Sequence, residues 1–159
     1  MRKIDQLLSE YGESHQNHTN KLIHWICVPV IFFSIVCLVW SIPNGMLMEA
    51  FPWAGPFANW ATIILALVLV YYLTLSVSLF IGMVIWSAIC LYGAHLLNQV
   101  SFAPLWAIGL AIFFLAWAGQ FYGHKVEGKK PSFLKDIQFL LVGPAWLMHF
   151  IFRKLSLPY

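Results

Sequence analysis

Formal charge is nearly absent from the middle of the chain. No Asp, Glu, Lys or Arg occurs between Lys21 and Glu49, or between Glu49 and Lys125. Only 9% of the residues are charged and 61% are hydrophobic. In a soluble domain about a quarter of the residues are charged. The lack of charge therefore excludes an ordinary soluble domain and indicates an integral membrane protein.

Several familiar motifs are also missing. The sequence contains no Gly-rich phosphate loop, no Gly-x-Ser-x-Gly nucleophile elbow and no His-Glu-x-x-His zinc motif. The three cysteines lie within apolar runs, not in pairs at zinc-binding spacing, so we expect them to be reduced core residues: Cys27, Cys37 and Cys90. The few basic residues flank apolar segments, where positive charge orients a membrane protein, so no nucleic-acid partner is expected.

The long apolar runs predict membrane-spanning helices. One span needs roughly 20 apolar residues, and lipid offers the backbone no hydrogen-bond partner, so spans are helical unless residues alternate as in a barrel. No such alternation occurs here. We expect an all-α fold, a multi-pass transmembrane helical bundle formed by a single domain of residues 1–159. The four predicted spans cover about residues 22–40, 59–74, 77–97 and 104–122, with the boundary between the second and third near Tyr72–Ser76.

The regions outside these spans have their own patterns. Apolar residues on one stripe predict an N-terminal amphipathic helix over residues 1–16, followed by a break at Asn17–Asn20. Prolines and glycines predict a loop over residues 43–58. A last apolar helix, at about residues 133–152, is expected to be interrupted at Gly143-Pro144 and to be a C-terminal re-entrant or interfacial helix.

Lysine and arginine predict the orientation of the chain. They cluster before the first span and after the fourth, and the loops after the first and third spans contain none. The clustered residues are Arg2, Lys3, Lys21, Lys125, Lys129, Lys130 and Lys135. The positive-inside rule places both clusters, and with them both termini, on the cytoplasmic side. The membrane would be a bacterial inner membrane, or the endoplasmic reticulum in a eukaryote.

Histidines gather on this predicted cytoplasmic side. His15, His18 and His24 lie at the start of the first span, and His124 lies at the end of the fourth. Neutral imidazole is a common ligand of zinc and iron, so two remote groups at one membrane face indicate a metal site. His95 lies at the opposite end of the third span, where we expect a packing or interfacial role.

Helix geometry restricts such a site. His15 and His24 are nine residues apart, about half a turn out of phase on one continuous helix. Both can face one metal only if the chain breaks between them. Near His124, Gln120 lies about one turn earlier, and Glu127 is either a ligand or a residue that holds an imidazole by its second nitrogen.

The alternative is a set of ordinary interfacial histidines, whose rings combine an apolar body with a polar tip. Co-location with Asn20, Gln120 and Glu127 in a charge-poor chain favours the metal site. Six histidines suit a single metal ion better than a pair of metal ions. His149 follows a proline in the last helix and would approach the site only if that helix folds back.

Two blocks of the sequence resemble one known family. The first block contains, in order, Tyr11, His15, Asn20, His24 and Pro29. The second block, WAGQFYGHKVEGKKPSF, contains Trp117, Gln120, Gly123, His124, Glu127 and Pro131, and Pro144 follows it. Together they resemble the iron(II)-dependent 2-hydroxy fatty acid dioxygenases, which are small multi-pass membrane proteins of fatty acid α-oxidation. The resemblance covers nearly the whole chain.

The resemblance implies a metal site and a reaction. The implied Fe(2+) ligands are His15, His24 and His124, with Asn20, Gln120 and Glu127 beside them, while His18 matches less well and is a further candidate. The implied activity is O2-dependent cleavage of a 2-hydroxy fatty acid to a chain one carbon shorter. We expect the substrate to keep its tail among the helices or membrane lipid, with its carboxylate attracted by Lys21, Lys125 or Lys129.

Two other functions fit the same residues. A zinc-dependent lipid hydrolase would also use three imidazoles and a water molecule. A non-catalytic membrane scaffold would need no metal at all. A hydrolase would continue to work without O2, whereas a dioxygenase would not. A scaffold would contain no stoichiometric metal.

Overall fold

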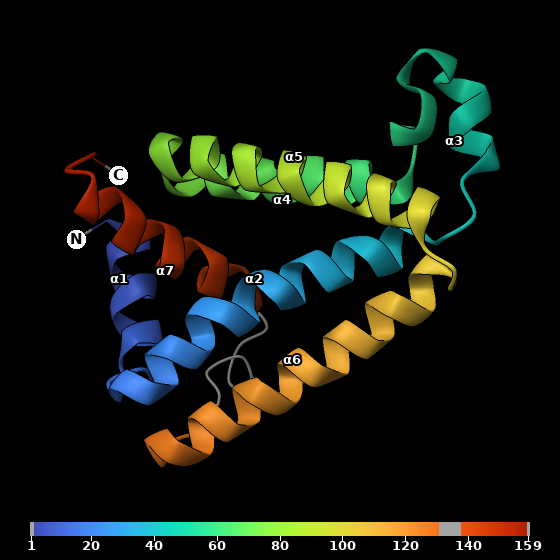
Figure 1. Cartoon of the computed structure of the whole chain (residues 1–159). Helices are drawn as coiled ribbons and strands as arrows, with labels where there is room; N and C mark the ends of the chain where they lie inside the picture. The colour runs from blue at the N-terminus through green and yellow to red at the C-terminus, as the bar shows by residue number, and fades with distance from the viewer. Residues whose placement is uncertain (1, 131–137, 159) are drawn as a thin grey trace.

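The computed structural model describes residues 2–130 and 138–158, and every regular element in these ranges is a helix (Figure 1). The elements are α1 (Lys3–Gly12), α2 (His18–Trp40), α3 (Gly45–Ala50), the 3-10 helix η1 (Pro52–Phe57), α4 (Trp60–Leu75), α5 (Val77–Val100), α6 (Leu105–Glu127) and α7 (Phe139–Lys154). The predicted all-α class is confirmed for this part of the chain.

Three helices, α2, α5 and α6, are long and apolar enough to cross a membrane. The fourth predicted span corresponds to α6 and the second to α4, which is apolar but has only 16 residues. At 1.5 Å per residue α4 extends about 24 Å, which is less than the roughly 30 Å of a hydrocarbon core. The structure therefore supports a membrane protein with three candidate spans and one shorter apolar helix.

The predicted boundary between the second and third spans is confirmed at Ser76. Its backbone is extended (φ −167°, ψ 132°), and its Oγ accepts a hydrogen bond from the N–H of Leu79 at 3.4 Å. Serine favours this N-cap position because its side chain satisfies an N–H group that lacks a partner in the first turn. A single residue thus joins α4 to α5, and the two helices form an antiparallel pair (Figure 1).

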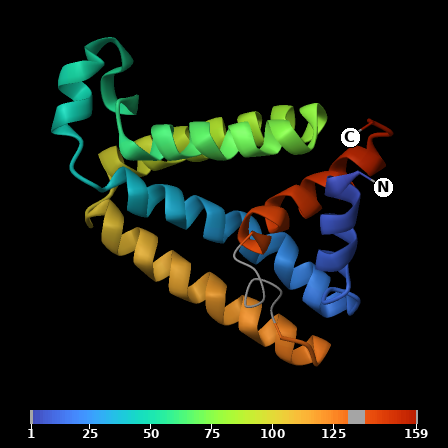
Figure 2. The same ribbon diagram turned by 180° about the vertical axis from the view of Figure 1, so that it is seen from behind.

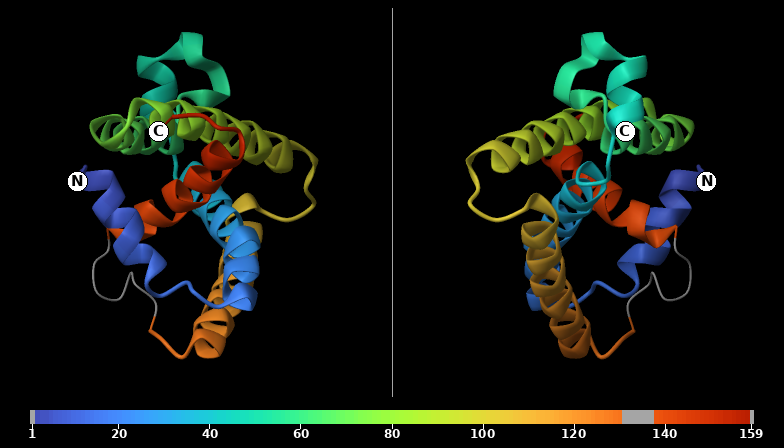
Figure 3. Two further views of the ribbon diagram at one scale, coloured as in Figure 1. Left: turned by 90° about the vertical axis from the view of Figure 1, so that its left-hand side faces the viewer. Right: turned by 90° about the vertical axis from the view of Figure 1, so that its right-hand side faces the viewer.

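The helices form a wedge. α2 packs along α6 and α4 packs along α5, and the two pairs approach each other near α3 and diverge toward the other end (Figures 1 and 2). α1 and α7 pack together across the wide end, where both termini lie (Figure 3). The start of α2 and the end of α6 reach this same end, so the two histidine-bearing segments meet there.

The amphipathic stripe predicted for the N-terminus is buried as expected. Ile4, Leu7, Leu8 and Tyr11 all lie on one face of α1 and pack into a cluster with apolar side chains of α7, among them Val142 and Trp146. This packing attaches α1 to α7. It also brings Tyr11, the last residue of the stripe, next to the histidines described below.

The predicted bounds at the start of the chain need correction. The first helix ends at Gly12, and α2 begins at His18, so the break lies at residues 13–17 and not at Asn17–Asn20. The side chain of Asn17 accepts hydrogen bonds from two N–H groups of the first turn of α2, at 2.9 and 3.4 Å. This asparagine therefore caps the helix, and Asn20 lies inside it.

Two further predictions differ from the structure. The predicted loop over residues 43–58 contains the short helices α3 and η1. The predicted interruption at Gly143-Pro144 is wrong, since α7 continues through both residues. A proline removes one backbone donor, which a helix held by tertiary packing can tolerate, and both residues are buried. Part of the predicted last helix, residues 133–137, lies outside the described residues, as does the Pro131 position.

α2 and α6 approach closely because α6 has two glycines one turn apart. A Cβ atom at Gly119 would lie 2.7 Å from Sγ of Cys27, and one at Gly123 would lie 2.5 Å from Oδ1 of Asn20. Both distances are shorter than van der Waals contact allows. Small residues at this spacing let two membrane helices pack backbone to backbone.

We expect Gly123→Ala to lower stability by about 1–3 kcal/mol, because the added methyl group must displace Asn20 or push α6 away from α2. Thermal unfolding of the detergent-solubilised protein would measure the loss. Gly45→Ala is the matched control, because a Cβ atom there meets nothing within 4 Å. Equal midpoints for the two variants would contradict the close approach of α2 and α6.

Candidate metal centre

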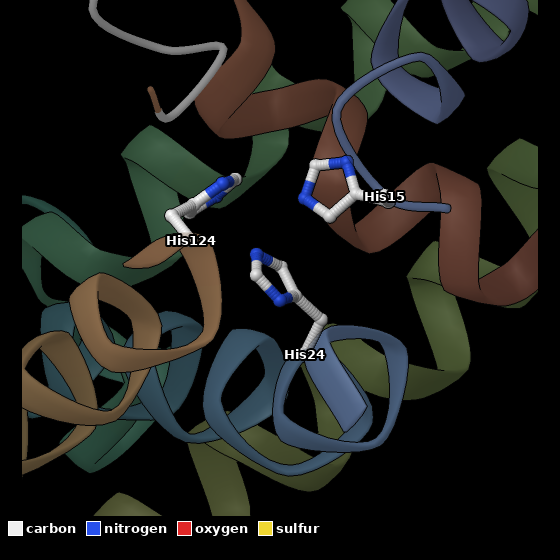
Figure 4. Close-up of side chains that lie close together, drawn as sticks. All are labelled: His15, His24 and His124. Carbon is white, nitrogen blue, oxygen red and sulfur yellow. The ribbon is translucent and has the colours of Figure 1, made fainter. Parts of the chain in front are cut away.

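Three imidazoles from three parts of the chain lie close together (Figure 4), and the segments that carry them meet at the wide end of the wedge (Figure 1). His15 lies between α1 and α2, His24 lies near the start of α2, and His124 lies in the last turn of α6. The ring centroids of His15 and His24 are 4.3 Å apart, those of His15 and His124 are 5.0 Å apart, and those of His24 and His124 are 4.9 Å apart. One candidate ligand nitrogen of each ring lies within 4.8 Å of the other two.

Backbone carbonyl groups orient two of the rings. Nδ1 of His15 lies 2.6 Å from the carbonyl oxygen of Tyr11, and Nδ1 of His24 lies 2.9 Å from that of Asn20. A carbonyl oxygen can only accept, so each Nδ1 carries the proton and donates it. Nε2 of both rings is then left with a lone pair, which is the arrangement that a metal ligand needs.

Two nitrogens of the cluster lack a protein partner. Nε2 of His15 and Nδ1 of His124 are buried, and neither has a hydrogen-bond partner among the described residues. A buried polar atom without a partner costs free energy, so such an atom in a native protein calls for a cause, of which a bound ion or water molecule is one. Unpartnered imidazole nitrogens that converge in this way fit a bound metal ion.

Burial also keeps the imidazole of His15 neutral. Desolvation lowers the pKa of His15 to about 4, although its hydrogen bond to the Tyr11 carbonyl opposes this shift. At neutral pH Nε2 of His15 therefore has no proton to lose before it binds a metal. The ring of Tyr11 stacks on this imidazole with a centroid distance of 4.2 Å and an interplanar angle of 12°. It shields one face of His15 from water.

Glu127 connects the end of α6 to the segment that carries His15. Its Oε1 accepts a hydrogen bond from the N–H of Gln16 at 2.8 Å. Its Oε2 accepts hydrogen bonds from the N–H of Asn17 at 2.9 Å and from Nδ2 of Asn20 at 3.0 Å. The sequence left open whether Glu127 is a metal ligand or a residue that holds a ligand in place. These contacts favour the second role, because they hold the connection between α1 and α2 that carries His15.

Asn20 extends this support to the second histidine. Its Nδ2 also donates to the backbone carbonyl oxygen of Ser14 at 3.2 Å. The backbone carbonyl oxygen of Asn20 accepts a hydrogen bond from Nδ1 of His24. The side chain is fully buried. One asparagine therefore couples the segment before His15, the start of α2 and Glu127 on α6.

The remaining candidates lie outside the cluster. His18 is exposed at the first position of α2. His95 packs against Trp40 and Phe57, with centroid distances of 6.0 and 5.4 Å, at the opposite end of α2. His149 lies on α7 and is not part of the three-histidine group found among the described residues. The opposite-end placement predicted for His95 agrees with the structure.

An apolar cavity begins at the imidazoles. It has a volume of about 250 Å³ and lies between α2, α4, α6 and α7. Tyr11, Gln120 and the three histidines line one end, and the other lining residues, on α2, α4, α6 and α7, are apolar or aromatic. None of the three lysines predicted to attract a carboxylate is among the described lining residues, and Nζ of Lys129 donates to the carbonyl oxygen of Glu13 at 2.6 Å.

The contribution of α7 to the site had no clear signal in the sequence. Trp146 packs against His15 with a centroid distance of 5.3 Å, and Phe139, Gly143 and Pro144 line the cavity. The one residue of α7 that the sequence analysis connected with the site was Pro144, which follows the second of the two sequence blocks. The fold-back of α7 onto α1 places these residues at the site.

The whole chain was compared with models of protein families. Residues 1–155 match the model of one family, described as 2-hydroxy-palmitic acid dioxygenase Mpo1-like. The chain belongs to this family. The match confirms the resemblance carried by the two sequence blocks, and membership in the Mpo1-like family implies a dioxygenase. Searches of curated proteins and of solved structures found no match.

Proposed function

We propose that this Mpo1-like protein is a non-haem iron(II) dioxygenase that cleaves 2-hydroxy fatty acids to acids one carbon shorter. The observation that carries this proposal is the convergence of three buried imidazoles, from His15, His24 and His124, at the end of an apolar cavity. Family membership supplies the reaction class. The imidazoles supply a site for the metal, and the cavity supplies space for an alkyl chain.

The residues present fit iron(II). Imidazole suits iron as well as zinc, and three protein ligands leave positions open for small molecules. Bound iron would supply the redox chemistry that lets O2 react with an organic acid. The protein would bind the substrate, orient its carboxylate and 2-hydroxyl group toward the three imidazoles, and exclude bulk water. Gln120, buried at this end of the cavity, is placed to donate to a substrate oxygen.

The overall reaction balances without a further co-substrate. The bond between the carboxyl carbon and the hydroxyl-bearing carbon breaks. The hydroxyl-bearing carbon becomes the carboxyl group of the shortened acid, and the original carboxyl group leaves as carbon dioxide. These changes release four electrons, which reduce O2 completely, and one water molecule forms.

We also propose that the protein crosses the membrane four times, with both termini in the cytoplasm. The described lysines and arginines lie at the start of α1 and of α2, at and just beyond the end of α6 and at the end of α7, all toward the wide end of the wedge (Figure 1). The positive-inside rule favours the cytoplasm for that end. The metal site then lies at the interface, where a fatty acid keeps its tail in lipid and where Lys21 and Lys125 attract its carboxylate.

Oxygen dependence tests the proposal. Purified protein loaded with iron(II) should consume O2 when 2-hydroxypalmitate is added and should release the acid one carbon shorter. Turnover should stop without O2, and palmitate without the hydroxyl group should not react. Carbon dioxide from a carboxyl-labelled substrate would confirm the balance. A zinc hydrolase would instead work without O2 on an ester or amide, and a scaffold would hold no stoichiometric metal.

A further inference from the structure

The cavity beside the imidazoles is elongated along α2. Beyond His24, the side chains of Val28, Ile31, Val36 and Val39 line it in succession. At 1.5 Å per residue Val28 is about 6 Å from His24 along the helix axis, and Val39 is about 22 Å away. The cavity therefore extends from the metal site through most of the thickness of a hydrocarbon core.

The opposite wall comes from α4, which runs antiparallel to the same part of α2. Val68 packs with the cluster that contains Val28, near the imidazoles, and Ala61 packs with the cluster that contains Val36, near the far end. Ala61 is 1% exposed, so α4 packs tightly against its neighbours at this end. All of these side chains are aliphatic, so the wall offers an alkyl chain contacts and offers no hydrogen bonds.

One side of the cavity reaches the molecular surface. Ile35 on α2 and Ile64 on α4 both line it, yet they are 40% and 43% exposed. Both helices are apolar, and the exposed surface beside these isoleucines would face lipid. A molecule dissolved in the bilayer can therefore reach the cavity from the side, without passing through water.

We propose that this cavity holds the alkyl chain of the 2-hydroxy acid, that the chain enters sideways between Ile35 and Ile64, and that Val39 and Ala61 limit its length. The inference rests on the proposed function, because the imidazoles fix where the carboxyl end lies. Each position along α2 then corresponds to a position along the chain. The arrangement favours a long alkyl chain over a short polar acid.

Phenylalanine substitutions at two depths test this correspondence. Ile31→Phe fills the cavity about 10 Å from His24 along the axis, and Val39→Phe fills it near the far end. Leu67→Phe is the matched control, because Leu67 lies on α4 but is 67% exposed and is not among the lining residues. Two readouts are needed: turnover of saturated 2-hydroxy acids from ten to eighteen carbons, and calorimetric binding of the same acids to metal-free protein in nanodiscs.

Ile31→Phe should shift both profiles toward the shorter acids, and Val39→Phe should affect only the longest. We expect the preference for eighteen over ten carbons to fall at least about tenfold in Ile31→Phe, because each methylene that loses its buried site weakens binding about fourfold. Leu67→Phe should keep the wild-type profile. Unfolding midpoints identify any variant that fails to fold. If Ile31→Phe or Val39→Phe fails, the remaining one of the two is the test.

The outcomes separate this inference from the function it rests on. If all three variants keep the wild-type length profile, the chain lies outside the cavity in lipid and the inference is wrong. If wild-type protein binds the acids with a length profile that Ile31→Phe shifts, but turns none of them over, the cavity assignment stands and the proposed reaction fails. If wild-type protein turns them over with no length preference, only the length limit is overturned.

Discussion

Replacing His24 or His124 with alanine is expected to remove both bound iron and turnover. The three imidazoles come from separate elements, and the described residues place no other histidine, cysteine or carboxylate in the group. Loss of one ligand leaves two, so affinity should fall by more than the roughly 10–100-fold seen when a residue that merely orients a ligand is changed. Iron per protein by mass spectrometry and O2 uptake with 2-hydroxypalmitate measure the two effects.

The same series contains its own controls. His18→Ala removes an exposed imidazole three residues from His15, and His95→Ala removes one at the opposite end of α2. Both variants should keep wild-type iron content and turnover within about twofold, since surface changes usually alter stability by less than 0.5 kcal/mol. If His18→Ala lost iron as completely as His24→Ala, the three-histidine assignment would be wrong.

Glu127→Gln is expected to weaken iron binding about 10–100-fold without removing any ligand. The carboxylate accepts hydrogen bonds from Gln16, Asn17 and Asn20. A glutamine offers one oxygen instead of two and turns its NH2 group toward at least one of these N–H donors. The segment that carries His15 would then shift relative to α2 and α6. Titration of metal-free protein with iron(II) under anaerobic conditions measures the affinity.

Glu13→Gln provides the matched control for this variant. Glu13 is exposed on the same connection, and it contacts Lys129 through its backbone carbonyl oxygen, which the substitution keeps. The change in charge is the same, so a purely electrostatic effect would appear in both variants. Glu127→Gln should also shift unfolding to lower temperature, and high iron(II) should rescue its turnover. No rescue by iron(II) would argue that Glu127 acts on the substrate instead.

Much of the architecture was predictable because membrane helices carry a simple signal. The apolar runs ending near Trp40, Leu75 and Val100 predicted three helix ends to within a few residues. Lipid forbids unpaired backbone groups, so an apolar run must be helical whatever packs against it. Where the chain leaves that environment, prediction was weaker. Asn17 is a helix cap and not a break, and α7 passes through Pro144 without interruption.

The candidate site divides in the same way. His15, His24 and His124 were predictable as partners, because the predicted spans bring their positions to one end of the helix bundle. The cavity was not, because it is formed where α4 and α7 come to lie against α2, and no motif on either helix predicted a cavity. The two roles open to Glu127 could not be separated from the sequence, and the positions of its hydrogen-bond donors now favour a supporting role.

A helical membrane protein of the Mpo1-like family with three grouped histidines was predictable from the linear chain, because hydropathy and the order of residues in the two sequence blocks are both properties of the sequence. The tertiary structure was needed to show which imidazoles lie together, which backbone groups bind the Glu127 carboxylate and where the apolar cavity lies. Those features depend on how α2 and α6 approach through glycines and how α7 folds back onto α1. Distances between residues more than 100 positions apart are set by packing, which no local pattern encodes.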